Sequence, residues 1–239
     1  MTNAKKTQKS VLRHLAIILD GNRRWAKARG LKTMQGHYKG YQKLKEVSDW
    51  CIESGITVLT VYAFSTENWN RSKGEVSYLM DLIRRLLREE EKEFMKRGVR
   101  VKLVGDRAML YKDIQEMFSH IEEVTKENKN LTLQLAISYG GRREIACAFQ
   151  SLCREYSKRG KNPEDISEDE ISRHLWTAGV SDPDVILRTG GEKRLSNFLP
   201  WQAVYSELIF LDQEWPAFSR DDFTAVLAEF KNRQRRFGR

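Results

Sequence analysis

A chain of 239 residues that is 40% hydrophobic and 31% charged can bury one sizeable core, and three cysteines without paired spacing argue against a disulfide framework or a zinc cluster. No apolar stretch approaches the roughly 20 residues of a membrane-spanning helix, and the polar N-terminus lacks the apolar region of a signal peptide, so we expect a soluble cytoplasmic protein. The formal charge of +9 suits nucleic acid, anionic lipid and a phosphorylated small molecule equally well.

Short apolar runs alternate with stretches of helical period, a pattern typical of a mainly parallel sheet with helices on its faces. The expected strands, in chain order, are 14–19, 57–62, 99–104, 131–137, 184–187 and, more weakly, 208–211. The expected helices begin near Asn22, cover 41–51, 76–95 and 113–128, begin again near Arg142, and cover 220–235. We therefore predict a single α/β domain over residues 13–239, with a central sheet of about six strands and a flexible N-terminus over residues 1–12.

Two polar segments are expected to face solvent. The acid run Glu89–Glu91 on the long helix is most simply a solvated face. The stretch 158–170 carries Pro163 and is predicted to be a loop, too close to the strand at Asp184 to open a new domain.

Polar side chains follow four of the apolar runs at the point where each run ends. Asp20 follows the first run, the cluster 65–71 the second, the segment 138–142 the fourth, and Arg188 the fifth. The carboxyl ends of parallel strands meet at one edge of a sheet, where α/β enzymes bind their ligands. We therefore expect these four clusters to converge.

The first cluster begins with Asp20 and continues through Gly21, Asn22, Arg23 and Arg24. A single aspartate in a turn is more often a helix N-cap than a ligand. Its place behind five apolar residues, and ahead of a glycine, an amide and two guanidiniums, favours a role with magnesium or a diphosphate.

The second cluster holds Ser65, Glu67, Asn68 and Arg71, with Trp69 as an anchor. It is either a plain polar loop or a loop that lays a hydroxyl, an amide and a guanidinium along one ligand. The residues alone leave both interpretations open. The segment 138–142 is more simply a glycine turn, and the lone His37 is most often a surface or capping histidine.

The last cluster, behind the strand that ends near Arg188, sets two arginines and a hydroxyl beside the pair Gly190 and Gly191. Guanidinium forks and amides bared by glycine suit phosphate oxygens, and carboxylates suit magnesium. Arg188, Arg194 and Ser196 therefore predict an anion site. Dinucleotide-binding, P-loop, nucleophile-elbow and zincin motifs do not occur, so a dehydrogenase, a P-loop kinase and a serine hydrolase are disfavoured.

The segments HLAIILDGN (14–22), GH (36–37), YAFSTENWNR (62–71), SYGGR (138–142) and 188–207 occur in the order that is typical of the cis-prenyltransferases, a family that this chain resembles up to its last residues. The resemblance implies magnesium-dependent condensation of isopentenyl diphosphate onto an allylic diphosphate such as farnesyl diphosphate. It implies a long-chain polyprenyl diphosphate as product, such as undecaprenyl diphosphate, the lipid-carrier precursor for cell-wall synthesis.

The resemblance also implies roles for individual residues. Asp20 would hold Mg²⁺, with Glu207 near the metal. The allylic diphosphate would be bound by Gly21, Asn22, Arg24 and His37, and isopentenyl diphosphate by Arg188, Arg194 and Ser196. Arg23 and Trp25, which adjoin Arg24, are expected to bind substrate as well. Ser65, Asn68 and Arg71 would lie between the substrates, with Glu67 and Trp69 on a mobile loop. Of these residues, Asp20, His37, Ser65 and Asn68 are expected to be catalytic.

The same resemblance implies an apolar tunnel under the sheet, with Ala63 and Leu131 at its mouth and floor and the apolar stripe 76–87 as its wall. It implies a homodimer completed by Arg236 and Gly238, no nucleic-acid partner, and peripheral membrane contact through the lipid product. The chain has Arg23 where the family usually has glycine, and Thr33 where it usually has arginine.

Two other functions fit parts of the pattern. An apolar strand ending in Asp20 also resembles the nucleophile strand of haloacid-dehalogenase phosphohydrolases, although Asn22 stands where that chemistry needs a second aspartate. The positive charge also fits a module that binds RNA or an anionic membrane.

Overall fold

The computed structural model describes residues 11–233 and contains one six-stranded sheet in the order β3-β4-β2-β1-β5-β6. The strands are β1 His14–Ile18, β2 Val58–Ser65, β3 Val99–Val104, β4 Leu131–Tyr139, β5 Val185–Arg188 and β6 Glu207–Phe210. Every neighbouring pair is parallel. The six predicted strands and the single α/β domain are therefore confirmed, with small shifts at the strand ends.

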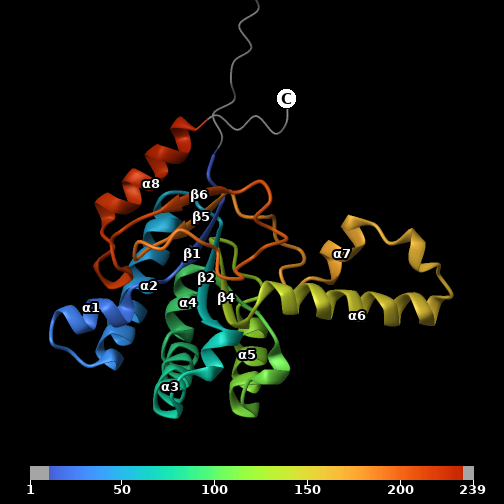
Figure 1. Cartoon of the computed structure of the whole chain (residues 1–239), viewed down its shortest axis with the longest axis horizontal. Helices are drawn as coiled ribbons and strands as arrows, with labels where there is room; N and C mark the ends of the chain where they lie inside the picture. The colour runs from blue at the N-terminus through green and yellow to red at the C-terminus, as the bar shows by residue number, and fades with distance from the viewer. Residues whose placement is uncertain (1–10, 234–239) are drawn as a thin grey trace, which may run out of the picture.

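Helices pack on the sheet and extend beyond it. They are α1 Asn22–Ala28, α2 Thr33–Glu53, α3 Lys73–Glu89, α4 Glu91–Arg97, α5 Lys112–Val124, α6 Gly141–Arg159, α7 Glu168–His174 and α8 Arg220–Asn232. Figure 1 shows α6 and α7 projecting from the body as an arm. Among residues 11–233, no helix is long and apolar enough to cross a lipid bilayer.

The inner strands β1, β2, β4 and β5 are largely buried on both faces, which is why they are rich in apolar residues. Leu15 and Ile17 of β1 belong to the larger core cluster, while Ala16 and Ile18 belong to the smaller one on the other face. The larger cluster joins the sheet to α2, α3, α5 and α8. A tunnel between α2 and α3 would therefore lie on the face of the sheet that the larger cluster covers.

Two predictions about the helices are wrong. The long helix expected over 76–95 is interrupted at Glu90, which is buried and accepts hydrogen bonds from Lys45 Nζ and Tyr41 Oη, each at 2.8 Å. Glu90 is therefore part of a buried polar cluster and not of a solvated face. The expected loop 158–170 also contains the start of α7, where Ser167 accepts a hydrogen bond from the backbone amide of Glu170 as the N-cap.

Some predictions lie outside the described residues. These are most of the flexible N-terminus predicted over residues 1–12, and the roles of Arg236 and Gly238 at the C-terminus.

Candidate active site

Four strand ends meet at one edge of the sheet, as predicted. Ile18 of β1 lies beside Tyr62 of β2 on one side and beside Arg188 of β5 on the other. Tyr62 in turn lies beside Ala136 of β4. Because all of these strands are parallel, the segments that follow them open onto the same crevice.

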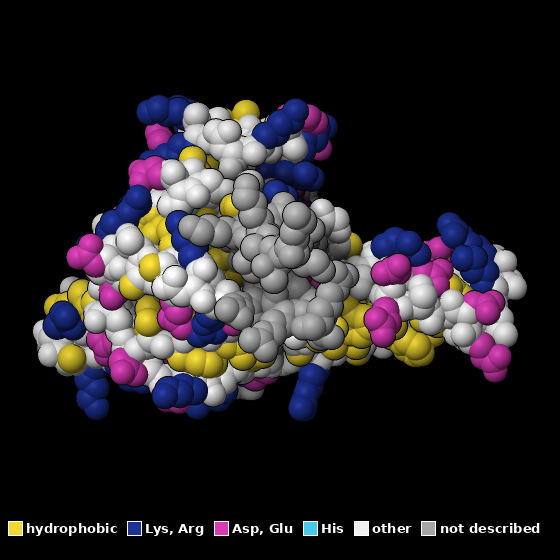
Figure 2. Space-filling view, turned by 90° about the horizontal axis from the view of Figure 1, so that it is seen from above, with side chains coloured by type: hydrophobic (Ala, Val, Ile, Leu, Met, Phe, Trp, Pro, Cys, Tyr) yellow, Lys and Arg dark blue, Asp and Glu magenta, His cyan; other side chains and the backbone are white. Residues whose placement is uncertain are grey.

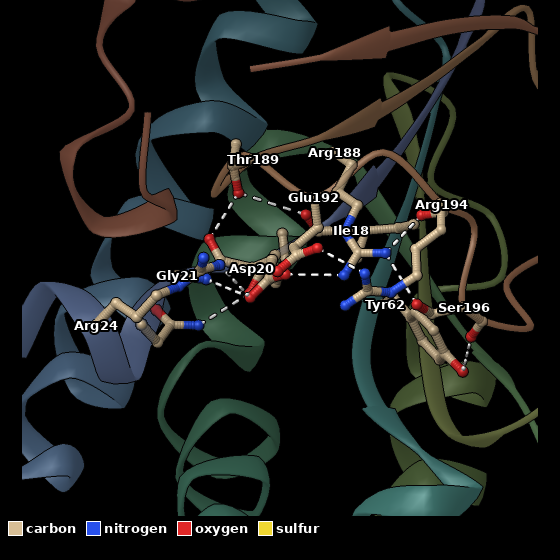
Figure 3. Close-up of polar contacts among 12 residues, drawn as sticks. Ile18, Asp20, Gly21, Arg24, Tyr62, Arg188, Thr189, Glu192, Arg194 and Ser196 are labelled. Atoms are coloured by element: carbon tan, nitrogen blue, oxygen red, sulfur yellow. Dashed lines mark hydrogen bonds and ion pairs between the residues drawn. The ribbon is translucent and has the colours of Figure 1, made fainter. Parts of the chain in front are cut away.

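Asp20 occupies the centre of this crevice (Figure 3). Its Oδ1 accepts hydrogen bonds from the backbone amide of Gly21 at 2.7 Å and from Nη2 of Arg24 at 3.1 Å. Its Oδ2 accepts one from Nη2 of Arg188 at 2.8 Å. Asp20 is thus a charged group shared by an arginine from α1 and an arginine from the end of β5.

Arg188 is almost fully buried and organises the segment that follows it. Its Nη1 donates to the backbone oxygen of Arg194 and, at 2.9 Å, to the hydroxyl oxygen of Ser196. Its Nε is buried with no partner among the described residues, an uncommon situation for a charged group. The Arg194 side chain itself is exposed and pairs with Glu192. It is therefore available to a ligand.

Glycines allow α1 and α2 to approach closely around Asn22. A Cβ added at Gly36 would lie 2.1 Å from the backbone oxygen of Asn22, and one at Gly40 would lie 2.2 Å from its side-chain oxygen. Gly21 has φ +103°, a conformation that L side chains rarely adopt, and its position would bring a Cβ against Glu214. Because α1 and α2 lie this close, His37, one residue after Gly36, lines the crevice.

Two cavities meet at Asp20. The first, which we name the polar bowl, encloses about 840 Å³ and is rich in cationic side chains. Its lining includes Asp20, Gly21, Asn22, Arg23, Arg24, Lys27, Lys32, Thr33, His37, Arg71, Glu192 and Arg194. Five cations stand here besides Arg71, which fits an anionic ligand carrying several charges.

The second cavity, which we name the apolar tunnel, encloses about 630 Å³ and shares Asp20, Asn22, His37 and Arg71 with the polar bowl. Its walls include Tyr41, Leu44, Ala63, Leu79, Leu82, Ile83, Leu86, Leu135 and Ile137. The stripe on α3 thus lines a cavity and also packs into the core. Ala63 lines the cavity as expected, whereas Leu131 is buried and is not among its lining residues.

His37 is buried beside two charged side chains. Its Nε2 lies 3.2 Å from Oε1 of Glu75, and the same oxygen accepts a hydrogen bond from Nη1 of Arg71 at 2.9 Å. Burial lowers the pKa of His37, and the neighbouring Glu75 only partly opposes this. We did not predict Glu75 from the sequence, because it stands in the first turn of α3, where an acidic residue is ordinary.

The segment that follows β2 forms a short 3-10 turn over Thr66–Asn70, which is η1. The side-chain oxygen of Asn68 accepts a hydrogen bond from the backbone amide of Ser65 at 3.1 Å, and Nε1 of Trp69 donates to the hydroxyl of Ser138 at 2.8 Å. Ser65, Glu67 and Asn68 line the apolar tunnel, while Trp69 packs against the larger core cluster and does not line the tunnel. The turn therefore presents its polar side chains to the crevice.

Besides Trp69, two of the expected site residues lie outside both cavities. Trp25 lines neither cavity and packs under the guanidinium of Arg29, 4.5 Å from its ring centre. Glu207 begins β6 beside Val185, at the opposite end of the sheet from Asp20, and pairs with Arg233 at 2.8 Å. Strand β6 runs toward the edge of the sheet where Asp20 lies, and Glu207 is its first residue and therefore the farthest from Asp20. Within one chain, the expectation that Glu207 lies near a metal held by Asp20 is wrong.

Asp20 fits a magnesium ion that is shared with a substrate. Among residues 11–233, no cluster of three or more histidine, cysteine, aspartate or glutamate side chains could hold a metal by itself. Magnesium is usually bound through one or two carboxylates together with substrate phosphates. A single, partly exposed carboxylate at the rim of a cationic bowl matches that pattern.

Comparison with known proteins points to one family. The model of a family described as putative undecaprenyl diphosphate synthase matches residues 18–238. Isoprenyl transferase 2 of Bradyrhizobium diazoefficiens is 44% identical over 94% of this chain and 89% of its own length. The tritrans,polycis-undecaprenyl-diphosphate synthase (geranylgeranyl-diphosphate specific) of Pyrococcus abyssi is 44% identical over 98% of this chain and 90% of its own.

Two solved structures have the same fold. Lavandulyl diphosphate synthase from Lavandula x intermedia, in complex with dimethylallyl diphosphate, superposes with a TM-score of 0.92 at 35% identity, over 96% of this chain and 99% of that one. A probable undecaprenyl diphosphate synthase from Campylobacter jejuni superposes with a TM-score of 0.79 at 34% identity, over 96% of this chain and 100% of its own.

Proposed function

The chain belongs to the undecaprenyl diphosphate synthase family of cis-prenyltransferases, and from that premise we propose that it condenses isopentenyl diphosphate units onto an allylic diphosphate in the presence of magnesium. The observation that carries this proposal is the pairing of Asp20 with Arg188 where the polar bowl opens into the apolar tunnel. Charged head groups and a growing hydrocarbon need these two environments side by side. Family membership also favours this activity over the phosphohydrolase and the RNA- or membrane-binding module.

The allylic diphosphate is proposed to bind in the polar bowl. Gly21 and Asn22 line the bowl at the start of α1, and Arg23 and Arg24 offer guanidiniums that match phosphate oxygens. His37 lines the same space. Burial lowers its pKa, so near pH 7 the ring is neutral and its single N–H, on Nε2, is directed at Glu75, which fixes the ring at the rim of the bowl without adding charge. Thr33 stands where the family usually has arginine, and the neighbouring Lys32 supplies a cation in its place.

Isopentenyl diphosphate is proposed to bind beside Arg188, Arg194 and Ser196. The supporting observations are that the Arg188 guanidinium is fixed by three bonds, that its Nε has no partner, and that Arg194 is exposed nearby. A fixed guanidinium loses little entropy when it binds an anion. The two diphosphates are therefore proposed to lie side by side at Asp20.

The reaction needs a leaving group to be stabilised and an alkene to be held in place. Magnesium bound at Asp20 would stabilise the negative charge that develops on the departing diphosphate. Arg24 and Arg71 would bind the same group as it leaves, beside the ring of His37. Ser65 and Asn68 line the apolar tunnel between the proposed sites, where the proton is lost from the condensing unit.

The hydrocarbon chain is proposed to grow into the apolar tunnel between α2 and α3. Its walls are mainly aliphatic and aromatic, so each added unit would leave water as it enters. We propose farnesyl diphosphate as the primer and a long polyprenyl diphosphate, such as the lipid-carrier precursor for cell-wall synthesis, as the product. The named relatives differ here: the Pyrococcus abyssi enzyme is geranylgeranyl-diphosphate specific, and the lavender enzyme was solved with dimethylallyl diphosphate.

A homodimer is part of the proposal. Phe149 on α6, Val204 and Tyr205 are large apolar side chains that are 54%, 70% and 69% exposed. Figure 2 shows hydrophobic side chains along the arm of α6 and α7 where it meets the body. Exposed apolar side chains of this size favour a partner surface. Because the proposed product is a lipid, contact of a cytoplasmic enzyme with a membrane through that product belongs to the same proposal.

The test is incubation with labelled isopentenyl diphosphate, magnesium and, in separate reactions, dimethylallyl, geranyl, farnesyl or geranylgeranyl diphosphate. Chromatography by carbon number should give polyprenyl diphosphates, with the highest kcat/KM for farnesyl diphosphate. Release of inorganic phosphate without chain growth would support the phosphohydrolase instead. Tight, steeply salt-dependent RNA binding without turnover would support the binding module.

A further inference from the structure

Asn197 joins three segments that are far apart in the sequence. Its side-chain Nδ2 donates to Oε1 of Glu67 in η1 at 3.1 Å, and its Oδ1 accepts a hydrogen bond from the backbone amide of Arg142 at 2.9 Å. Its backbone oxygen accepts another from the amide of Gly141 at 2.8 Å. One side chain therefore connects the turn after β2 and the start of α6 to the segment that carries Ser196.

The backbone at this point is in an uncommon conformation. Ser196, Asn197 and Leu199 have φ values of +50°, +65° and +47°, a region in which residues other than glycine are rare and asparagine is among the best tolerated. Phe198, between them, is fully buried and stacks on Tyr62 with ring centres 4.6 Å apart. Such a conformation persists only where surrounding contacts determine it, so the loop is held in place by its neighbours.

The glycine pair at the start of α6 makes room for these contacts. A Cβ at Gly140 would lie 2.6 Å from the hydroxyl oxygen of Thr66 and 2.9 Å from Nδ2 of Asn197. A Cβ at Gly141 would lie 2.0 Å from Cδ of Pro200. The segment 138–142, which from the sequence was most simply a glycine turn, therefore also shapes the rim of the candidate site.

These contacts continue into the centre of the site. Ser196, next to Asn197, accepts a hydrogen bond from Arg188, and Arg188 donates to Asp20. Ser196, Asn197 and Glu67 all line the apolar tunnel. A series of hydrogen bonds thus runs from Asp20 through Arg188 to Ser196. Asn197, the next residue, bonds to Glu67 and so connects the loop that carries Ser196 to η1.

We propose that Asn197 is a positioning residue that holds the loop bearing Ser196 against the turn bearing Glu67, so that the isopentenyl diphosphate site is fully formed only while this link is made. The inference rests on the proposed function. Asn197 acts through its neighbours: it fixes where the Ser196 hydroxyl and the Arg188 guanidinium stand. Breaking the link should therefore weaken isopentenyl diphosphate binding much more than allylic diphosphate binding.

The structure offers a substitution that breaks one bond and keeps the other. In Asn197→Asp, one carboxylate oxygen can still accept from the Arg142 amide, but the donor to Glu67 is lost and two carboxylates face each other. Glu67→Gln restores a donor from the opposite side of the pair. The double variant should therefore recover a link that the single Asn197→Asp variant lacks.

The measurement is the KM for isopentenyl diphosphate, the KM for farnesyl diphosphate and kcat for wild type, Asn197→Asp, Glu67→Gln and the double variant. Asn197→Asp should raise the KM for isopentenyl diphosphate by about 10-fold or more, because a hydrogen bond to a charged group is replaced by a repulsion. The KM for farnesyl diphosphate should change by less than about 3-fold. The double variant should recover most of the loss.

Two further variants separate positioning from folding. Asn197→Gly keeps the positive φ but removes both side-chain bonds, and should also raise the KM for isopentenyl diphosphate. Asn162→Asp makes the same chemical change at an exposed N-cap, where aspartate is equally suitable, and should leave both KM values unchanged.

The inference is overturned if Asn197→Asp leaves the KM for isopentenyl diphosphate unchanged, or raises it without recovery in the double variant. It is also overturned if the only effect is a lower melting temperature with a uniform loss of kcat. The proposed function fails separately, if wild-type protein does not elongate any allylic primer.

Discussion

Nη2 of Arg188 donates a hydrogen bond to Oδ2 of Asp20 at 2.8 Å, although 168 positions separate the two residues. The parallel register of β1 and β5 brings them together, since Ile18 lies directly beside Arg188. The two proposed diphosphate sites therefore share a charge pair. A substitution at either residue is expected to affect both sites, whereas substitutions farther from the pair should separate them.

Arg194→Ala should separate the two sites. Arg194 is exposed, lines the polar bowl near Glu192, and is proposed to bind isopentenyl diphosphate. The KM for isopentenyl diphosphate should rise roughly 10- to 100-fold, because a charge-assisted hydrogen bond contributes about 1.5–3 kcal/mol. Steady-state kinetics with each substrate varied in turn would measure this. Arg159→Ala, an exposed arginine at the end of α6, is the control, and a defect confined to the allylic substrate would mean that the two sites are exchanged.

Gly36→Ala should destabilise the protein. The added methyl would lie 2.1 Å from the backbone oxygen of Asn22, so α1 must move away from α2. Such overpacking costs about 1–3 kcal/mol and would displace His37. Gly74→Ala is the matched control, since a Cβ there has nothing within 4 Å and alanine favours a helix. Thermal unfolding of the two variants should give a lower midpoint only for Gly36→Ala, and equal midpoints would contradict the described packing.

The buried His14 should make stability depend on pH. Burial, only partly opposed by the Ser181 carbonyl and the charge of Asp184, lowers the pKa of His14 from 6.5 to about 4. Between these two values the unfolded chain binds more protons than the folded one, so stability should fall as pH falls through that window, by about 3 kcal/mol in all. Urea unfolding of wild type and His14→Gln at pH 7 and pH 4 would measure this contribution. The exposed His120 provides the control variant His120→Gln, and an unchanged pH slope in His14→Gln would refute the assignment.

Leu86→Trp should shorten the product. Leu86 lines the apolar tunnel from α3, and an indole there would take space that the growing hydrocarbon needs. We expect products shorter by at least one isoprene unit, measured by chromatography of the labelled chains. Arg88→Trp introduces the same side chain on the exposed face of α3 and should leave the product length unchanged. Identical products from Leu86→Trp and wild type would mean that the chain grows elsewhere.

The sequence predicted the sheet and the convergence of its strand ends because both depend on local signals. An apolar run bounded by polar residues identifies a strand such as β1, and parallel strands place their carboxyl ends at one edge. Asp20 and Arg188 could therefore be brought together before any coordinates were known. The cationic character of the polar bowl follows from the same motifs.

Residues that act through tertiary contacts could not be predicted in this way. Glu75 and Asn197 are ordinary in their local sequence, and only the packing of α3 on α2 and of the loop on η1 shows what they contact. Glu207 was misplaced because a motif gives the order of residues but not the register of the following strand. Glu90 was assigned to solvent because its burial depends on Lys45 and Tyr41 of another helix.

The most direct test of the account is incorporation of labelled isopentenyl diphosphate by wild type and Asp20→Asn, each with magnesium and with excess chelator. If Asp20 holds a magnesium ion between the two diphosphates, wild type should elongate farnesyl diphosphate only with metal, and Asp20→Asn should lose about 10²–10³-fold in kcat while keeping its circular dichroism spectrum. Full turnover by a folded Asp20→Asn variant would contradict the central claim.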